Sequence, residues 1–125
     1  MVIALIVGAG GFIGAIARYG INSGFGRLLP DQWLPYGTLT VNVVGCLLIG
    51  VVAGLIDDKQ IGGGELRAFV VIGILGGFTT YSAFGYETIN LIRDGNISAA
   101  IVNIAAQIVL GLGAVWIGYK LATVA

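Results

Sequence analysis

The chain has 125 residues, of which 58% are hydrophobic and only 10% are charged, and its mean hydropathy is +1.01. Soluble domains carry about 25% charged residues, so this composition excludes a soluble fold and predicts an integral membrane protein with one domain over residues 1–125. The chain lacks histidine, the commonest general base and metal ligand, and its single cysteine, Cys46, excludes an intrachain disulfide.

Four apolar segments predict an all-α fold of four transmembrane helices. Each is close to the roughly 20 residues that cross about 30 Å of hydrocarbon. They cover residues 2–21, 36–56, 66–92 and 97–122. Four crossings place both termini on the same side of the membrane.

The first segment contains closely spaced glycines after an apolar run, which imitates a dinucleotide-binding loop. The Gly-x-Gly-x-x-Gly fingerprint starting at Gly8 would need glycine at position 13, where the chain has Ile13. Gly10 and Gly14 instead fit the small-x-x-x-small pattern of close helix packing. Arg18 closes this predicted span, either as a cation at the headgroups or as part of a vestibule that attracts anions.

The second segment carries Thr38 and Asn42 on one helical face, and Gly50 and Gly54 as a further packing contact. An amide this deep in a span is costly unless it finds partners. Two interpretations of Asn42 stay open at this point. It forms an interhelical hydrogen bond, or its N–H donors face a pore and bind an anion.

The third segment is the most unusual, because three glycines and two adjacent threonines lie in its middle, residues 73–80. These are poor helix formers, so we predict a transmembrane helix broken there. Such breaks often mark ion sites, because freed carbonyls can coordinate a cation. Tyr81 and Phe84 follow on one helix face, and Glu87 after them suggests either an ion path or a structural contact.

The fourth segment carries Asn96, Asn103 and Gln107 within about 20° of a common line, which small residues continue. This stripe is either a packing seam joined by amides or a water- or ion-lined wall. The spans hold no ring of charges that would select an ion by its sign. They hold amide and hydroxyl donors beside aromatic edges, which suit a small anion. The donors are Asn42, Thr79, Thr80, Ser82 and Asn103.

The six cations divide equally between the two sides of the membrane. Lys59, Arg67 and Lys120 accompany the termini, whereas Arg18, Arg27 and Arg93 lie opposite. Orientation normally follows an excess of Lys and Arg in cytoplasmic loops. Their balance predicts dual topology, in which oppositely inserted subunits pair antiparallel through a closed two-fold interface. The alternative is that one strong local signal fixes the orientation.

Three segments together carry a family resemblance: residues 10–19, 37–42 and 73–84. With the length and the four spans, they resemble the Fluc/CrcB family of fluoride channels over essentially the whole chain. The resemblance implies a fluoride-selective channel, not an enzyme, that passively exports F⁻ across the inner (plasma) membrane and lowers cytoplasmic fluoride. It also implies an antiparallel homodimer with two pores in the lipid bilayer, and no nucleic-acid partner.

The resemblance further implies roles for individual residues. The family's aromatic pair corresponds to Tyr81 and Phe84, its pore amide to Asn42, its hydroxyl after the first ring to Ser82, and its vestibule arginine to Arg18.

A structural Na⁺ that is not transported would sit at the dimer centre. Backbone carbonyls of Gly76 and Thr79 from both subunits would hold it, and oxygen ligands suit a hard cation.

The chain departs from the family pattern in two places. Tyr81 replaces the usual Phe, and Asn103 and Gln107 stand where the family often has an aromatic residue and a hydroxyl. Three alternatives remain: a heterodimer of diverged subunits, a small multidrug/proton antiporter, and an assembly subunit that transports nothing. The antiporter needs a membrane acid in the first span, which has none, so Glu87 would have to serve.

Overall fold

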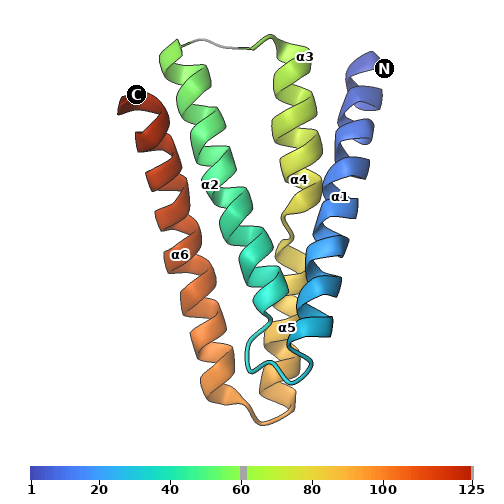
Figure 1. Cartoon of the computed structure of the whole chain (residues 1–125), viewed down its shortest axis with the longest axis vertical. Coiled ribbons are helices and arrows are strands. Elements are labelled where there is room, and N and C mark those ends of the chain that lie inside the picture. Colours follow the sequence, from blue (N-terminus) through green and yellow to red (C-terminus); the bar gives the residue numbers. More distant parts are fainter. Residues whose placement is uncertain (60–61, 125) are drawn as a thin grey trace.

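The computed structural model describes residues 1–59 and 62–124; Gln60, Ile61, Ala125 and the Lys59 side chain lie outside this description. The chain is an up-and-down arrangement of four long apolar helical spans, each long enough to cross a membrane (Figure 1). It is therefore a multi-pass membrane protein. Both termini lie at one end of the molecule (Figure 1).

Three of the spans are single α-helices, and the third is composite. The single helices are α1 (Val2–Leu28), α2 (Tyr36–Lys59) and α6 (Ile97–Val124). The third span consists of α3 (Gly64–Arg67), the π-helix η1 (Ala68–Leu75), the short helix α4 (Gly76–Phe78) and α5 (Tyr81–Arg93). All four spans begin close to the predicted positions, and Pro, Gly or charged residues mark the starts of the last three.

The first helix is longer than the sequence analysis predicted. We expected a span that ends near residue 21, with Arg18 close to its end, but α1 continues to Leu28. The polar residues after Tyr19 do not break a helix, and Pro30 is the first residue that must. Arg18 is thus a half-buried residue well inside α1.

The helices pack in two pairs, α1 with η1 and α4, and α2 with α6. Glycines make both contacts close, as predicted for Gly10, Gly14, Gly50 and Gly54. A Cβ on Gly14 would collide with the backbone of Ile74 and lie 2.8 Å from the Phe78 nitrogen.

In the contact between α2 and α6, a Cβ on Gly50 would collide with the Val115 carbonyl, and one on Gly54 would lie 2.7 Å from the Ala122 Cβ. Backbones approach this closely only where no side chain intervenes, which is the usual basis of helix association in lipid. The interpretation of these glycines as packing contacts is confirmed.

Between α4 and α5, Thr79 and Thr80 have extended backbones, with ψ angles of 157° and 117°. Gly73 lies in the π-helix η1, and Gly76 and Gly77 lie in α4, so the extended backbone covers two residues of the predicted segment 73–80. The Thr80 hydroxyl caps α5 by accepting the Ala83 N–H at 3.2 Å. The interior glycines are used for packing instead: a Cβ on Gly73 would lie 2.9 Å from the Val7 carbonyl oxygen, and one on Gly77 would lie 2.7 Å from that of Gly11.

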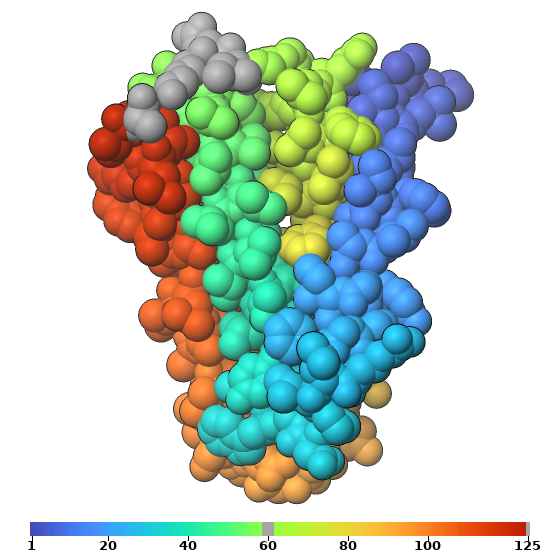
Figure 2. Space-filling view, viewed as in Figure 1, coloured from blue at the N-terminus to red at the C-terminus, as the bar shows by residue number. Residues whose placement is uncertain are grey.

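The two pairs of helices separate around the middle of the molecule. Figure 2 shows gaps between α2 and the η1–α4 segment on the face drawn there. At the end opposite the termini, α2, α5 and α6 come together (Figure 1), and hydrogen bonds between their side chains connect them.

Candidate functional site

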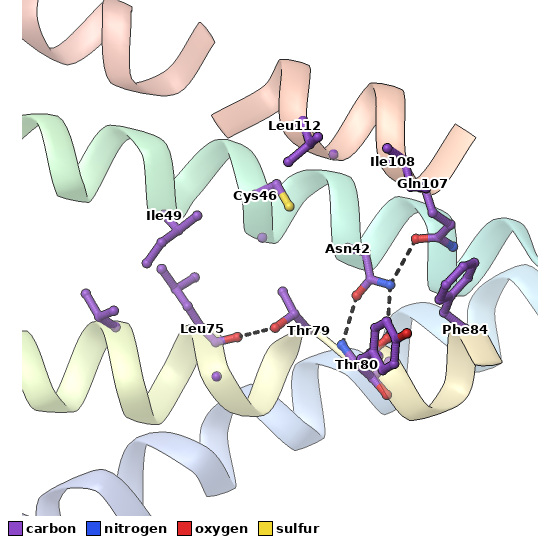
Figure 3. Close-up of a pocket in the computed structure, with 15 residues that line it drawn as sticks. Asn42, Cys46, Ile49, Leu75, Thr79, Thr80, Phe84, Gln107, Ile108 and Leu112 are labelled. Atoms are coloured by element: carbon purple, nitrogen blue, oxygen red, sulfur yellow. Dashed lines mark hydrogen bonds between the residues drawn. The ribbon is translucent and has the colours of Figure 1, made fainter. Parts of the chain in front are cut away.

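A cavity of about 490 Å³ lies where the two helix pairs separate (Figure 3). Its wall is mostly apolar and comes from α2, η1, α4, α5 and α6. Four of the predicted pore residues line it, namely Asn42, Thr80, Tyr81 and Phe84, as do Gly76 and Thr79. Within the described part of the chain, the lining does not include Arg18, Ser82 or Asn103.

The Asn42 side chain pairs with the extended backbone of Thr80 (Figure 3). Its Oδ1 accepts the Thr80 N–H at 2.8 Å, and its Nδ2 donates to the Thr80 carbonyl at 3.1 Å. In an unbroken helix the Thr80 N–H would donate to the Gly76 carbonyl. The amide of α2 therefore replaces the helical partners of one residue in the third span, at a depth where water cannot do so.

The second N–H of Asn42 donates to Gln107 Oε1 on α6 at 3.1 Å. Both amide donors thus have protein acceptors, which is the interhelical hydrogen bond that the sequence left as one of two alternatives. Whether Asn42 also contacts an ion stays a prediction.

A buried polar chain continues from this point between α5 and α6. Gln107 Nε2 approaches Asn103 Oδ1 at 3.5 Å, and Asn103 Nδ2 donates to Thr88 Oγ1 at 3.0 Å. The Thr88 hydroxyl in turn donates to the Phe84 carbonyl at 2.7 Å. Asn103 is fully buried. This geometry supports the packing-seam interpretation at Asn103. Asn96 does not join the stripe, because it lies in the turn before α6 and is exposed.

The two aromatic rings at the start of α5 are in edge contact. The Tyr81 and Phe84 ring centroids are 5.7 Å apart, with an interplanar angle of 61°. Tyr81 is 85% exposed in this single chain although it lies near the middle of the third span. Ser82 lies beside them, with its Oγ 3.4 Å from the Thr80 hydroxyl.

The carbonyls of Gly76 and Thr79 are the predicted sodium ligands. The N–H groups that would reach them in a continuous helix have other partners: the Thr80 N–H donates to Asn42, and the Ala83 N–H donates to the Thr80 hydroxyl. The Gly76 and Thr79 carbonyls therefore lack these helical partners, and both residues line the cavity; carbonyl oxygens are ligands that suit a hard cation.

Glu87 lies outside the cavity, farther along α5. Its carboxylate accepts a hydrogen bond from the Thr38 hydroxyl of α2. This contact joins the two helices one turn before Asn42, which supports the structural alternative for Glu87. Among the described residues, no group of three or more acidic, Cys or His side chains could hold a metal ion.

Two of these pairings were not predicted from the sequence. The helical periodicity placed Gln107 on a polar stripe but did not pair it with Asn42, and Thr88 was not among the predicted residues at all. Thr88 lies four residues after Phe84, the spacing at which a helical hydroxyl reaches a carbonyl, and that spacing was a signal in the sequence. The pairing of Gln107 with Asn42 depends on how α2 and α6 align, which no local pattern encodes.

Comparison with known proteins identifies the family. The model of the family "CrcB-like protein, Camphor Resistance (CrcB)" matches residues 5–119. A protein of Clostridium novyi (strain NT) called "Fluoride-specific ion channel FluC" is 42% identical over 121 residues, which cover 97% of this chain and 94% of the relative. Proteins with the same name from Methylobacillus flagellatus and Paracoccus denitrificans are 40% and 45% identical, over 94% and 91% of this chain and 91% and 89% of their own lengths. The match covers all four spans and the cavity, and the chain belongs to the CrcB family.

Proposed function

We propose that this protein is a fluoride-selective ion channel of the plasma membrane, which lets F⁻ leave the cytoplasm passively. The observation that carries the proposal is the identity of 40–45% to relatives named as fluoride-specific channels, over nearly the full length of the chain. A channel needs no general base or nucleophile, and the histidine-free chain is consistent with a protein that is not an enzyme.

The chemistry of the cavity supports an anion as the permeating species. Tyr81 and Phe84 meet edge to face, and the edge of an aromatic ring carries partial positive charge. Amide and hydroxyl donors of Asn42 and Thr80 lie in the same wall. Neutral donors and ring edges can replace part of the hydration shell of a small anion without binding it as tightly as a fixed cation would.

The complete channel is an antiparallel homodimer in this proposal. A single chain leaves an apolar cavity open beside Tyr81, a residue that is 85% exposed at membrane depth. A polar group exposed to hydrocarbon is costly, and a second subunit would cover it. The equal division of cations between the two ends permits both orientations of insertion.

Sodium is the proposed structural ion of that dimer. The carbonyls of Gly76 and Thr79 would supply two oxygens from each subunit, and four oxygens form a suitable partial shell for a hard cation. The ion would neutralise the carbonyl dipoles left without helical partners beside the extended residues. It would not be transported.

One observation favours a proton-coupled antiporter as a second candidate, namely a carboxylate inside a span. Glu87 is half-buried, and its carboxylate accepts a hydrogen bond from Thr38. However, α1 contains no Asp or Glu, and Glu87 does not line the cavity. An antiporter would lose substrate-driven proton movement in Glu87→Gln, whereas the channel proposal expects fluoride flux without any proton requirement.

The test of the proposal is efflux from liposomes that contain the purified protein, with fluoride and chloride electrodes side by side. Rapid fluoride release with little chloride release is expected. Release of both ions would reject the selectivity. No release of either would reject the homomeric channel and favour a missing partner subunit or a non-transporting protein, which co-purification from the host membrane would distinguish.

A further inference from the structure

Asn42 has no free N–H in this structure, and this affects how it could meet an ion. One Nδ2 proton is directed at the Thr80 carbonyl and the other at Gln107 Oε1, both at 3.1 Å. An anion entering the cavity needs a donor, so one of these two bonds has to open before Asn42 can bind it.

The two bonds differ in what their loss would leave behind. The Thr80 carbonyl belongs to the extended segment, and its own N–H is already bonded to the same amide. Opening that bond would leave the Thr80 backbone carbonyl without its partner at membrane depth, and turning the amide toward the cavity would also break its bond to the Thr80 N–H, which is costly. Opening the bond to Gln107 frees only the side-chain carbonyl of Gln107. The other end of that amide makes only a long contact, 3.5 Å from Gln107 Nε2 to Asn103 Oδ1.

We propose that Gln107 is a positioning residue of the site that competes with the anion for the second N–H of Asn42. Gln107 and Asn42 both line the cavity, and Figure 3 shows the Asn42 side chain between Thr80 and Gln107, with Phe84 nearby. Gln107 thereby sets how readily Asn42 releases a donor toward the cavity. This inference deepens the proposed function and rests on it for the identity of the anion.

The first test measures the initial rate of fluoride efflux against internal sodium fluoride concentration, in wild type and three variants. Gln107→Met removes the competing acceptor at nearly equal length, and Gln107→Glu retains an acceptor. Thr123→Val is the matched control, because it removes a polar group of α6 that bonds only within its own helix.

The half-saturating fluoride concentration should fall about tenfold in Gln107→Met, because fluoride no longer has to displace the hydrogen bond between Asn42 and residue 107. It should stay within about threefold of wild type in Thr123→Val. It should rise in Gln107→Glu, because the carboxylate accepts the Asn42 N–H more strongly and its charge repels the anion. An unchanged or raised value in Gln107→Met would overturn the proposal, as would an equal fall in Gln107→Glu. A purely structural role would change the maximal rate or the yield of protein rather than this concentration.

The second test needs neither flux nor a variant. Hydrogen exchange of the Asn42 side-chain amide, followed by NMR in the labelled full-length protein, should show both Nδ2 protons protected. Rapid exchange of one proton would mean that Gln107 does not hold it, and would reject the proposal. If wild type carried no fluoride, the proposed function would fail, while this exchange measurement would still decide whether Gln107 engages Asn42.

Discussion

Two kinds of helix contact hold the molecule together by different means. α1 meets η1 and α4 through bare backbone, with Gly10 near Gly73 and Gly11 near Gly77. α5 meets α2 and α6 through directed hydrogen bonds of Thr38, Asn42 and Asn103. The glycine contact depends on the absence of atoms and tolerates no addition, whereas the polar contact depends on matched donors and acceptors and tolerates no mismatch.

The difference suits the position of each contact. Dispersion between close backbones has no directional preference, so it can anchor a helix without offering a site for an ion. Hydrogen-bonding side chains leave donors and acceptors next to the cavity, where a permeating ion can use them. We therefore expect substitutions in the glycine contact to affect folding first, and substitutions in the polar contact to affect flux first.

The largest effect should come from adding a side chain to the glycine contact. Gly14→Leu would place carbon atoms against the Ile74 and Phe78 backbones, which cannot move as a flexible side chain can. We expect a loss of at least about 3 kcal/mol of unfolding free energy, measured by denaturant titration in detergent. Gly8→Ala is the control, because a Cβ there meets nothing within 4 Å; equal losses in both variants would contradict the packing account.

Asn42→Asp should have the next largest effect, because it changes the polar contact between α2 and the third span. The variant keeps an acceptor for the Thr80 N–H but loses both donors and adds a negative charge beside the cavity. Fluoride efflux should fall roughly a hundredfold, since a lost donor and an added repulsion together are worth about 3 kcal/mol. Size-exclusion chromatography should show the same assembly as wild type.

Asn90→Asp gives the same chemical change on α5 away from the cavity, and it should conduct normally. Wild-type flux from Asn42→Asp would remove this residue from the pore.

Phe84→Ile should have a smaller effect, because it keeps a large apolar side chain and loses the ring that contacts Tyr81. We expect about a tenfold slower fluoride efflux with less than about 1.5 kcal/mol change in stability, the usual worth of an aromatic pair. Phe12→Ile is the control, since Phe12 is 69% exposed on the outer side of α1. A similar reduction from both substitutions would argue against a specific role for the Phe84 ring.

The smallest effect should come from the loss of one buried polar contact. The pair of Asn103 and Thr88 joins α5 to α6 at 3.0 Å. In a double-mutant cycle with Asn103→Leu and Thr88→Val, the coupling energy should be about 0.6 kcal/mol, as for other interhelical hydrogen bonds in membranes. A coupling near zero would mean that each side chain finds another partner when the first is removed.

Much of the site could be predicted because its residues are close in sequence. The spacing of Tyr81 and Phe84 already places their rings on one helix face, and the glycines and threonines of residues 73–80 mark the unusual segment. The pairing of Asn42 with Thr80 joins residues 38 positions apart, and that of Asn42 with Gln107 joins residues 65 apart. A periodic pattern shows that such side chains need partners but not which partners they find.

The sequence by itself determined the membrane class, the four spans and the small residues of the helix contacts, because hydrophobic length and glycine spacing are local properties of the chain. The tertiary structure decided the end of α1, the location of the extended residues at Thr79 and Thr80, and the partners of Asn42. In hydrocarbon, a freed backbone or amide group needs another protein group, a bound ion or a cavity as its partner, and which of these is in reach depends on how the helices align.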